Sequence, residues 1–530
     1  MPTPRLDRIL TCVLLFALTV SCGVIPVPAR DGQPAPRSSS PVPVTEAPST
    51  PALQATQPPA ATHKPKGTRG PKGTPGQGKP NPPGQSGPQA FPTSSYVTSA
   101  ADFNLILGRP TTNSITASLY SKTDRQITLA YGTQPGNYTA QIGPITLKAN
   151  TPKNLEITNL APDTSYVYTF NGVEHTFQTA RAPGSTFTFT LDADQHNRDP
   201  NFNGELYAIT LSNALADHPD FHINLGDTFM TEKVQARTYA EAESTFTDMR
   251  PYFGLLNADA PLFLVNGNHE GELGWLLKGT DNLAVWSTQL RQLYYPNPTP
   301  NGFYTGGSTP DAALGRARDG YYAWTWGDAI FIVLDPFWYT TPKPSPSDPN
   351  NNWNWTLGRE QYDWLKTTLE GSQAKFKFVF IHNLVGGRDT DGRGGIEAVP
   401  YFEWGGKNAD GSEGFAANRP GWGVPIHQLL IQNQVSAVFH GHDHVFVKQD
   451  LDGIVYQECP QPSMARYDQT QMAQEYGYLN GVILGSSGHL RLTVSPNAVT
   501  VDYVRAYLPQ DENASQKNGQ VSYSYTLSPR

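Results

Sequence analysis

The chain has 530 residues, a net charge of -8 and an isoelectric point near 5.8. This length allows a large core together with a smaller domain. The acidic balance and the lack of long Lys/Arg blocks exclude the electrostatic signature of a nucleic-acid-binding protein, so we expect no stable nucleic-acid binding.

Residues 1–22 are predicted to form an export signal. Two arginines precede an apolar run, residues 9–20, which is too short to span a bilayer as a helix. The tripeptide Ser21-Cys22-Gly23 that follows resembles a bacterial lipobox, which would make Cys22 the lipidated residue. Conventional cleavage nearby is the alternative. We therefore expect an exported, extracytoplasmic protein that is anchored to the membrane through Cys22 or is otherwise secreted.

The cysteine count agrees with a lipoprotein. Cys12 lies in the removable segment and Cys22 would carry lipid, so that Cys459 is the third and last cysteine of the sequence. An exported protein with one remaining cysteine has no intrachain disulfide. Its stability must then come from its core or from metal.

Residues 23–95 consist mainly of Pro, Gly, Ser and Thr, with almost no large apolar side chains. Such a segment cannot bury enough surface to fold, and we predict a disordered linker. In extended polyproline conformation, at about 3.1 Å per residue, it could hold a domain up to roughly 200 Å from its anchor.

Residues 96–183 are predicted to form a small antiparallel β-sandwich. Short runs with period-2 alternation are separated here by Gly, Pro, Asn and Asp turns. The segment NLAPDTSYVY resembles the strand corner of fibronectin type III domains, in which a tyrosine hydroxyl, here that of Tyr166, bonds to nearby backbone. We expect packing roles here and no chemistry. The predicted strands are 114–121, 126–133, 154–160, 165–172 and 175–180.

After Thr186 the pattern changes to buried strands that alternate with helices, which is typical of βαβ units. In such folds, polar sites gather beyond the carboxyl ends of the strands. This chain places its unusual polar residues at five such ends. They are Asp194 and His196, then Asp227, then Gly267-Asn268-His269-Glu270, then His382, and finally His442 and His444. The helices between the first three strands are expected at 206–216 and 232–256.

Each of these residues alone is more often a satisfied polar group than a metal ligand. Together they supply carboxylate, amide and imidazole groups, and no thiolate. One cation needs fewer groups than this, whereas two cations that share a bridging carboxylate would use nearly all of them.

In order and spacing, the blocks D-x-H, G-D, G-N-H-[DE], strand-end His and G-H-x-H resemble the calcineurin-like metallophosphoesterase family over roughly residues 186–510. The resemblance implies an α/β fold over residues 184–530, with a two-sheet core flanked by helices. The predicted hairpin at 489–504 would close one sheet. The fibronectin type III-like sandwich and the Pro-rich linker would precede this domain.

The resemblance also implies the ligand roles. Asp194, His196 and His444 would hold the first metal, Asn268, His382 and His442 the second, and Asp227 would bridge the two. His269 would be the catalytic histidine without a metal. In the same turn, Asp443 is expected to orient the turn or an imidazole, and His440 to be structural.

Two divalent or trivalent cations, Mn, Fe, Zn or Co, are the expected cofactors. The predicted reaction is attack of a metal-bridging hydroxide on phosphorus, while His269 stabilises the transition state or protonates the leaving oxygen.

A sandwich before such a domain resembles the arrangement of purple acid phosphatases, a branch of this family. That branch has a tyrosine three residues after the second-strand aspartate, where this chain has Met230. His196 also matches the general family. These departures argue against an iron–tyrosinate centre.

The expected partner is a phosphate-ester small molecule or a nucleotide. Asn197 and Arg198, next to His196, and Arg388 are candidate phosphate contacts. Two loops, 338–358 and 384–423, could line the pocket, although simple packing is the more common role for their Arg and aromatic residues. Monoester and diester substrates fit the motif equally well.

Three hypotheses follow for the function. The first is an exported phosphoesterase with two metals. The second keeps the fold as a surface binding module with little turnover, against which the complete ligand set argues. The third is an adhesive lipoprotein, for which attachment to cells would survive loss of the metal site.

Overall fold

The computed structural model describes residues 101–348 and 351–530. These residues belong to one compact unit. The predicted export signal, Cys22 and the predicted linker lie outside the described residues. Within the described part of the chain, no helix is both long and apolar enough to cross a membrane.

The N-terminal part is a sandwich of two antiparallel sheets around a shared apolar core. The hydroxyl of Tyr166 accepts a hydrogen bond from the backbone N–H of Ala161 (2.8 Å), as the sequence predicts. The fibronectin type III likeness itself stays a prediction. One sheet contains β1 (Phe103–Gly108), β2 (Ile115–Ser121) and β5 (Lys153–Ile157), and the other contains β4 (Ala140–Leu147), β3 (Arg125–Gly132), β6 (Ser165–Phe170) and β7 (Val173–Gln178).

The strand β1 is absent from the sequence prediction, and its environment explains why. Leu105 and Leu107 pack in the sandwich core, whereas Ile106 between them packs in the cluster formed by the neighbouring helices. Both faces are therefore buried, and the period-2 alternation that marks a half-exposed strand is missing.

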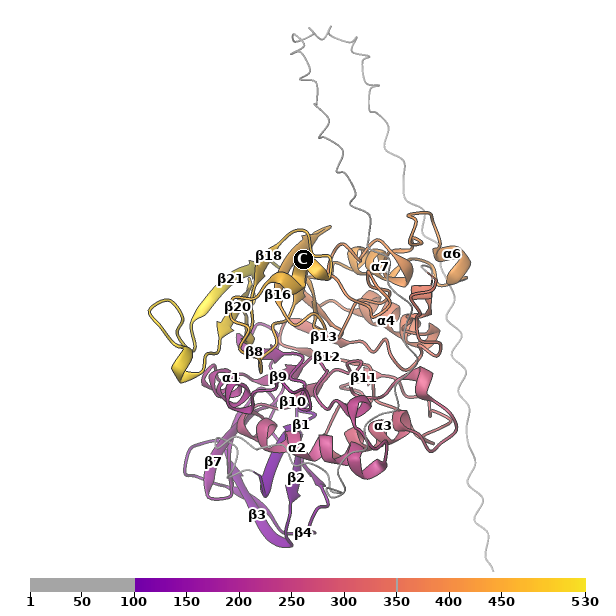
Figure 1. Ribbon diagram of the computed structural model, residues 1–530. Coiled ribbons are helices and arrows are strands. Elements are labelled where there is room, and N and C mark those ends of the chain that lie inside the picture. Colours follow the sequence, from indigo (N-terminus) through magenta and orange to yellow (C-terminus); the bar gives the residue numbers. More distant parts are fainter. Residues whose placement is uncertain (1–100, 349–350) are drawn as a thin grey trace, which may run out of the picture. The chain divides into compact units, whose positions relative to one another are not determined.

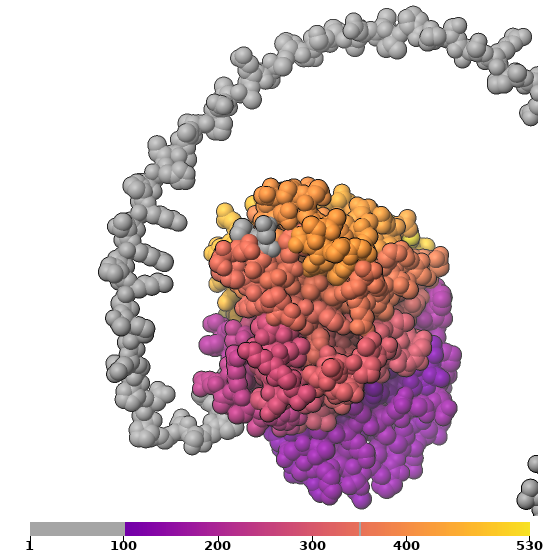
Figure 2. All heavy atoms as spheres, turned by 90° about the vertical axis from the view of Figure 1, so that its right-hand side faces the viewer, coloured from indigo at the N-terminus to yellow at the C-terminus, as the bar shows by residue number. Residues whose placement is uncertain are grey.

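Arg250 joins the sandwich to the rest of the unit. It lies on α2 (Tyr239–Asn257), is fully buried, and donates hydrogen bonds to Asn104 Oδ1 (2.8 Å) and to the backbone oxygen of Ser118 (2.8 Å). Its guanidinium also lies over the ring of Tyr120, at 5.5 Å from the centroid. Figure 2 shows the sandwich, in indigo to purple, directly against the magenta residues that follow it.

The remainder is an α/β structure with two sheets, which confirms the predicted fold class (Figure 1). The first sheet contains, in spatial order, β10 (Leu262–Leu264), β9 (Phe221–Asn224), β8 (Phe187–Asp192), β19 (Gly488–Val494), β20 (Val499–Arg505) and β21 (Val521–Leu527). The second contains β11 (Thr305–Gly306), β12 (Tyr322–Trp326), β13 (Ala329–Val333), β14 (Phe376–Phe380), β15 (Ala437–His440), β17 (Ile454–Glu458), β16 (Phe446–Leu451) and β18 (Val482–Leu484).

Three neighbours in the first sheet, β8 to β10, are parallel, and so are β13, β14, β15 and β17 in the second. The predicted hairpin is the antiparallel pair β19–β20. Between the sheets lies an aromatic core that includes Phe189, Phe331 and Phe380. Further helices are α1 (Gly204–Ala216), α3 (Leu283–Tyr294), α4 (Arg359–Gly371), α5 (Phe402–Gly405), α6 (Phe415–Asn418), α7 (Ile426–Gln432) and α8 (Gln471–Glu475). Short 3-10 turns are η2 (Thr231–Lys233), η3 (Gly274–Leu276), η4 (Asn351–Asn354) and η5 (Pro509–Asp511).

The helix expected at 232–256 begins later than predicted, at Tyr239. Thr238 is its N-cap, and the side chain of Thr238 accepts a hydrogen bond from the backbone N–H of Glu241. Thr and Glu three positions apart form the pattern of a capping box, which defines the start. The residues before it include η2, which brings Glu232 to the site described below.

Candidate metal centre

The candidate ligands follow strands of both sheets. Asp194 and His196 come after β8, Asp227 after β9, and Asn268 and His269 after β10; His382 follows β14, and His442 and His444 follow β15. Because these strands run parallel within each sheet, their carboxyl ends lie at the same edge. The structure brings the acidic and histidine ligands into three overlapping groups, in which the ligand atoms lie within 4.8 Å of one another.

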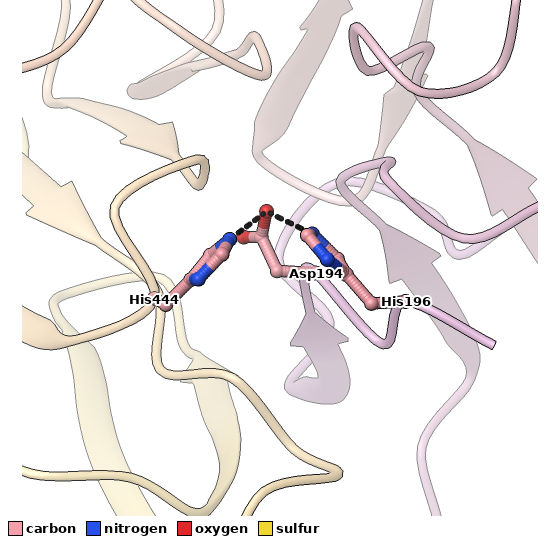
Figure 3. Close-up of side chains that lie close together, drawn as sticks. All are labelled: Asp194, His196 and His444. Carbon is pink, nitrogen blue, oxygen red and sulfur yellow. Dashed lines mark ion pairs between the residues drawn. The ribbon is translucent and has the colours of Figure 1, made fainter. Parts of the chain in front are cut away.

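Asp194 forms the centre of the first group. Its Oδ1 lies 3.7 Å from His196 Nε2 and 3.5 Å from His444 Nε2. Figure 3 shows the carboxylate between the two rings, which come from different strand ends. This is the set that the resemblance assigns to the first metal.

Asp227 lies between the first group and the second. Its Oδ2 is 3.5 Å from His196 Nε2 and 3.1 Å from His382 Nε2. His442 joins Asp227 and His382 in a further group. One carboxylate oxygen thus faces a histidine of each predicted metal, as a bridging ligand would.

Six ligand atoms are buried and have no hydrogen-bond partner among the described residues. They are Asp194 Oδ1, His196 Nε2, Asp227 Oδ2, Asn268 Oδ1, His382 Nε2 and His442 Nδ1. Buried polar atoms are normally paired, and an unpaired group costs about 1–3 kcal/mol. Six such atoms around one place fit cations, because oxygen and imidazole nitrogen are the donors that Zn, Mn and Fe accept.

The backbone at the site supports the same interpretation. Five ligand residues, Asp194, His196, Asp227, His442 and His444, have φ between 54° and 82°. This left-handed region is unfavourable for residues other than glycine and recurs at functional sites. Gly226, before Asp227, also has a positive φ of 97°, and a Cβ there would lie 2.4 Å from the backbone nitrogen of Gly267. Only glycine lets these two turns approach each other.

Glu270, the last residue of the G-N-H-E block, holds the turn that contains Asp227. Its carboxylate accepts hydrogen bonds from the backbone N–H groups of Asp227 (2.9 Å), Thr228 (2.6 Å) and Gly267 (2.5 Å). The sequence marks Glu270 as part of a motif but does not assign this role.

In two ligand imidazoles, a hydrogen bond to a backbone carbonyl determines which ring nitrogen carries the proton. His382 Nδ1 lies 2.9 Å from the oxygen of Leu225, and His442 Nε2 lies 2.9 Å from the oxygen of Asp391. A carbonyl accepts only from a protonated nitrogen, so the other ring nitrogen is free to bind metal. Asp391 belongs to the long 384–423 loop, which therefore supports a ligand.

Asp443 fixes the turn between His442 and His444. Its carboxylate accepts hydrogen bonds from the backbone N–H of Gly394 (2.8 Å) and from the Tyr478 hydroxyl (2.8 Å). Orientation of the turn is one of the two roles expected for it. His440 ends β15, with Nδ1 2.7 Å from Glu458 Oε2, and belongs to none of the three ligand groups.

The carboxylates change the protonation of the ligand histidines. Burial alone would lower the pKa of His382, but Asp227 and Asp194 raise this pKa to about 10. The same two carboxylates outweigh burial at His196 and raise its pKa to about 9. Without metal, these imidazoles therefore hold protons at neutral pH, and a cation must displace them.

His269 lies beside the ligands, and a carboxylate holds its far side. Its Nε2 is 3.8 Å from Asp227 Oδ2, and its Nδ1 is 2.5 Å from Glu232 Oε1. Burial alone would raise the pKa of Glu232, but the hydrogen bond to His269 contributes to lowering it to about 2. Sequence reasoning missed Glu232, because it follows no strand and no motif includes it.

The three predicted phosphate contacts have other partners in this structure. The side-chain amide of Asn197 donates to the backbone oxygen of Thr245 (3.1 Å), and Arg198 binds Ser244 (2.9 Å) and Asp248, all on α2. Arg388 lies 5.9 Å from the centroid of the Tyr401 ring. Their contact with substrate stays a prediction.

The 384–423 loop contains two short helices, α5 and α6, and several of its side chains pack. Arg419 pairs with the buried Glu403, with Nε 2.5 Å from Oε2. Trp404 is buried, and its indole donates to the Tyr456 hydroxyl (3.1 Å). For these residues, packing is the role that the structure shows.

Residues 193–446 match the model of the family described as calcineurin-like phosphoesterase. Among solved structures, PhoD is similar over 83% of this chain and 92% of its own, with a TM-score of 0.56 and 16% identity. Purple acid phosphatase PPD1 from yellow lupin (Lupinus luteus) seeds is similar over 80% of this chain and 74% of its own, with a TM-score of 0.51 and 16% identity. No curated protein matches the chain in sequence.

The family match and the two-sheet fold define the class of this protein as a metal-dependent hydrolase of phosphoric esters. The chain belongs, through the α/β part that contains residues 193–446, to the calcineurin-like metallophosphoesterase family. Members of this family use divalent metal ions, and the His/Asp groups described above are the candidate ligands. At 16% identity, the likeness to the two solved structures concerns the fold alone.

Proposed function

We propose that this protein is an exported phosphoesterase that hydrolyses phosphate mono- or diesters of small molecules or nucleotides at a centre of two metal ions. The observation that carries the proposal is the set of six buried, unpaired ligand atoms around Asp227. The candidate ligands fall into overlapping groups, and no single group within 4.8 Å holds them all, so two cations that share Asp227 fit them better than one.

Asp194, His196 and His444 would hold one cation, and Asn268, His382 and His442 the other. Mn, Fe, Zn and Co all suit this mixture of carboxylate, amide and imidazole. When bound, two such ions lower the pKa of a water molecule and neutralise the charge that develops on the phosphoryl oxygens.

His269 would serve as the acid for the leaving oxygen. Glu232 accepts a hydrogen bond from a proton on His269 Nδ1. The other ring nitrogen, Nε2, faces the candidate ligands and lies 3.8 Å from Asp227 Oδ2. The pair fixes the ring, and a proton on Nε2 can pass to the oxygen of the departing alcohol. Glu232 is therefore a positioning residue for His269.

Export and lipid attachment at Cys22 rest on the N-terminal sequence. A Cys22→Ser chain expressed beside wild type in a bacterial host with labelled fatty acid tests the anchor. Label in wild type and in Cys12→Ser, but not in Cys22→Ser, supports lipidation. Equal label in all three chains, or none in wild type with release of soluble protein, refutes it.

The decisive test of the enzyme is hydrolysis of para-nitrophenyl phosphate and bis-para-nitrophenyl phosphate by the chain without residues 1–22, with Mn, Zn or Fe added. We expect metal-dependent turnover that is lost in Asp227→Asn, and the ratio between the substrates will separate monoesterase from diesterase. Two bound ions per chain without turnover of either ester would favour the binding-module hypothesis.

A further inference from the structure

A second polar pocket lies where the sandwich meets the α/β part. It has a volume of about 190 Å³, and its lining includes Arg109 and Asn154 from the sandwich side and Gln292, Arg316 and Asp319 from the other. A single water needs only about 10–15 Å³ of such space, so the pocket can take a small polar ligand. No metal ligand of the candidate centre lines it.

Two arginines line this pocket. Neither Arg109 nor Arg316 has a side-chain hydrogen bond or ion pair within residues 101–348 and 351–530, and Arg109 Nε is buried. A guanidinium carries five N–H donors and a permanent charge. Arg109 is partly buried, where such a group is usually paired, whereas Arg316 is exposed to solvent. Together the two groups present a site for an anion.

The pocket also contains unpaired acceptors. Asp319 Oδ1 and Gln292 Oε1 are buried without a partner, whereas the other oxygen of Asp319 accepts from the Gln292 amide (3.1 Å). An anion with acceptor oxygens alone would satisfy the arginines and leave these two atoms unpaired. A ligand that also donates would satisfy both kinds of group.

The backbone holds Arg109 in this position. Arg109 has a φ of 50°, which is unfavourable for a long side chain. On one side, a Cβ at Gly108 would lie 2.6 Å from Pro296, so glycine is required for the close approach. On the other side, the Tyr304 hydroxyl donates to the backbone oxygen of Pro110. Such strain is typical of functional positions.

We propose that this pocket binds a protonated oxyanion, inorganic phosphate in its dihydrogen form, with its charged oxygens on Arg109 and Arg316 and its two O–H groups on Asp319 and Gln292. Phosphate keeps at least one O–H at neutral pH, whereas every sulfate oxygen is an acceptor only. The site therefore distinguishes the two ions by hydrogen bonding. This inference does not rest on the proposed function, because it involves no metal and no turnover.

Titration calorimetry of the full chain, stripped of metal by a chelator that is then removed by dialysis, tests the site. Without metals the candidate catalytic centre does not contribute cation-bound phosphate. We expect one phosphate to bind per chain. Its affinity should fall at least about tenfold in Arg109→Gln and in Arg316→Gln, and the affinity for sulfate should be at least about tenfold lower than that for phosphate. Lys517→Gln, which removes one exposed positive charge elsewhere, is the control and should bind as wild type does.

Asp319→Asn sharpens the test, because an amide can donate where the carboxylate cannot. We expect this variant to reduce the ratio of the affinity for phosphate to the affinity for sulfate. The proposal is overturned by a lack of phosphate binding to metal-free wild type, by unchanged affinity in both arginine variants, or by equal affinity for the two ions. Far-UV circular dichroism separates loss of a binding group from misfolding, and Arg316→Gln, an exposed position, provides the variant least disturbing to the fold.

Discussion

The sandwich and the α/β part differ in how many of their buried side-chain polar atoms have a hydrogen-bond partner. In the described sandwich residues, 101–180, Arg109 Nε is the one buried side-chain polar atom without a partner, and it faces the pocket discussed above. At the strand ends of the α/β part, six ligand atoms are unpaired within one small region. A cluster of unpaired ligand atoms, rather than a single unpaired atom, therefore distinguishes the candidate metal centre from the sandwich.

The largest effect should come from removing a ligand carboxylate. In Asp194→Ala, the first group loses its centre and the N–H of His442 loses its acceptor, Asp194 Oδ2. We expect bound metal to fall and ester turnover to drop at least about 10³-fold. Metal content by atomic emission and initial rates measure this.

Asp124→Ala is the matched control in the sandwich, where the carboxylate forms an exposed pair with Lys148 (2.7 Å). Its metal content and turnover should equal those of wild type. Equal losses in both variants would contradict the contrast between the two regions.

His269→Ala should keep the metal ions and lose turnover about 10²–10³-fold, because an acid is lost and no ligand is. Glu232→Gln should lower kcat more than it changes KM, since it affects the orientation of the His269 ring. Glu241→Gln, a half-buried residue in the first turn of α2, serves as control. Turnover within a few-fold of wild type in His269→Ala would refute its role.

Arg250→Leu tests how far the two regions depend on each other. The change removes the buried guanidinium that donates to Asn104 Oδ1 and to the backbone oxygen of Ser118. We expect the free energy of unfolding to fall by about 3 kcal/mol, measured by urea denaturation. An unchanged urea midpoint of unfolding would mean that the junction contributes little to stability. Separate unfolding transitions for the sandwich and the α/β part would show that Arg250 couples their unfolding.

Metal affinity should rise with pH. The pKa values of His382 and His196 are raised to about 10 and about 9 in the metal-free site, so metal must displace protons at neutral pH. Between pH 6 and 8 we expect affinity to increase about tenfold per pH unit for each proton displaced. Competition with a chelator of known affinity measures this, and a pH-independent constant would contradict it.

The smallest effect is expected at Tyr166. Tyr166→Phe removes the acceptor for the N–H of Ala161 and should cost about 1 kcal/mol of stability, without a change in metal content or turnover. Tyr131→Phe, on the same sheet, removes a hydroxyl that has no hydrogen bond within the described residues and is the control. A loss of turnover in Tyr166→Phe would show that the sandwich affects the site.

Much of the site could be predicted because each ligand directly follows a strand. The run FHINLGD ends in Asp227, and His382 is the second-last residue of KFKFVFIHN, so local periodicity located the strand ends. The order of the polar blocks at these ends, which resembles that of a known family, then selected the ligands. The structure then brought these residues within ligand distance of one another. The start of α2 was mistaken, because a helical pattern alone does not mark the cap at Thr238.

The sequence by itself determined the βαβ pattern, the order of the ligand blocks and the alternation of the sandwich strands, since all of these depend on neighbouring residues. Only the tertiary structure decided that Glu232 meets His269, that Asp391 supports His442, and that Arg109 and Arg316 face one pocket. The physical reason is that these contacts join segments far apart in the chain. No local period or spacing records them, and they exist only once the two sheets and the sandwich have packed.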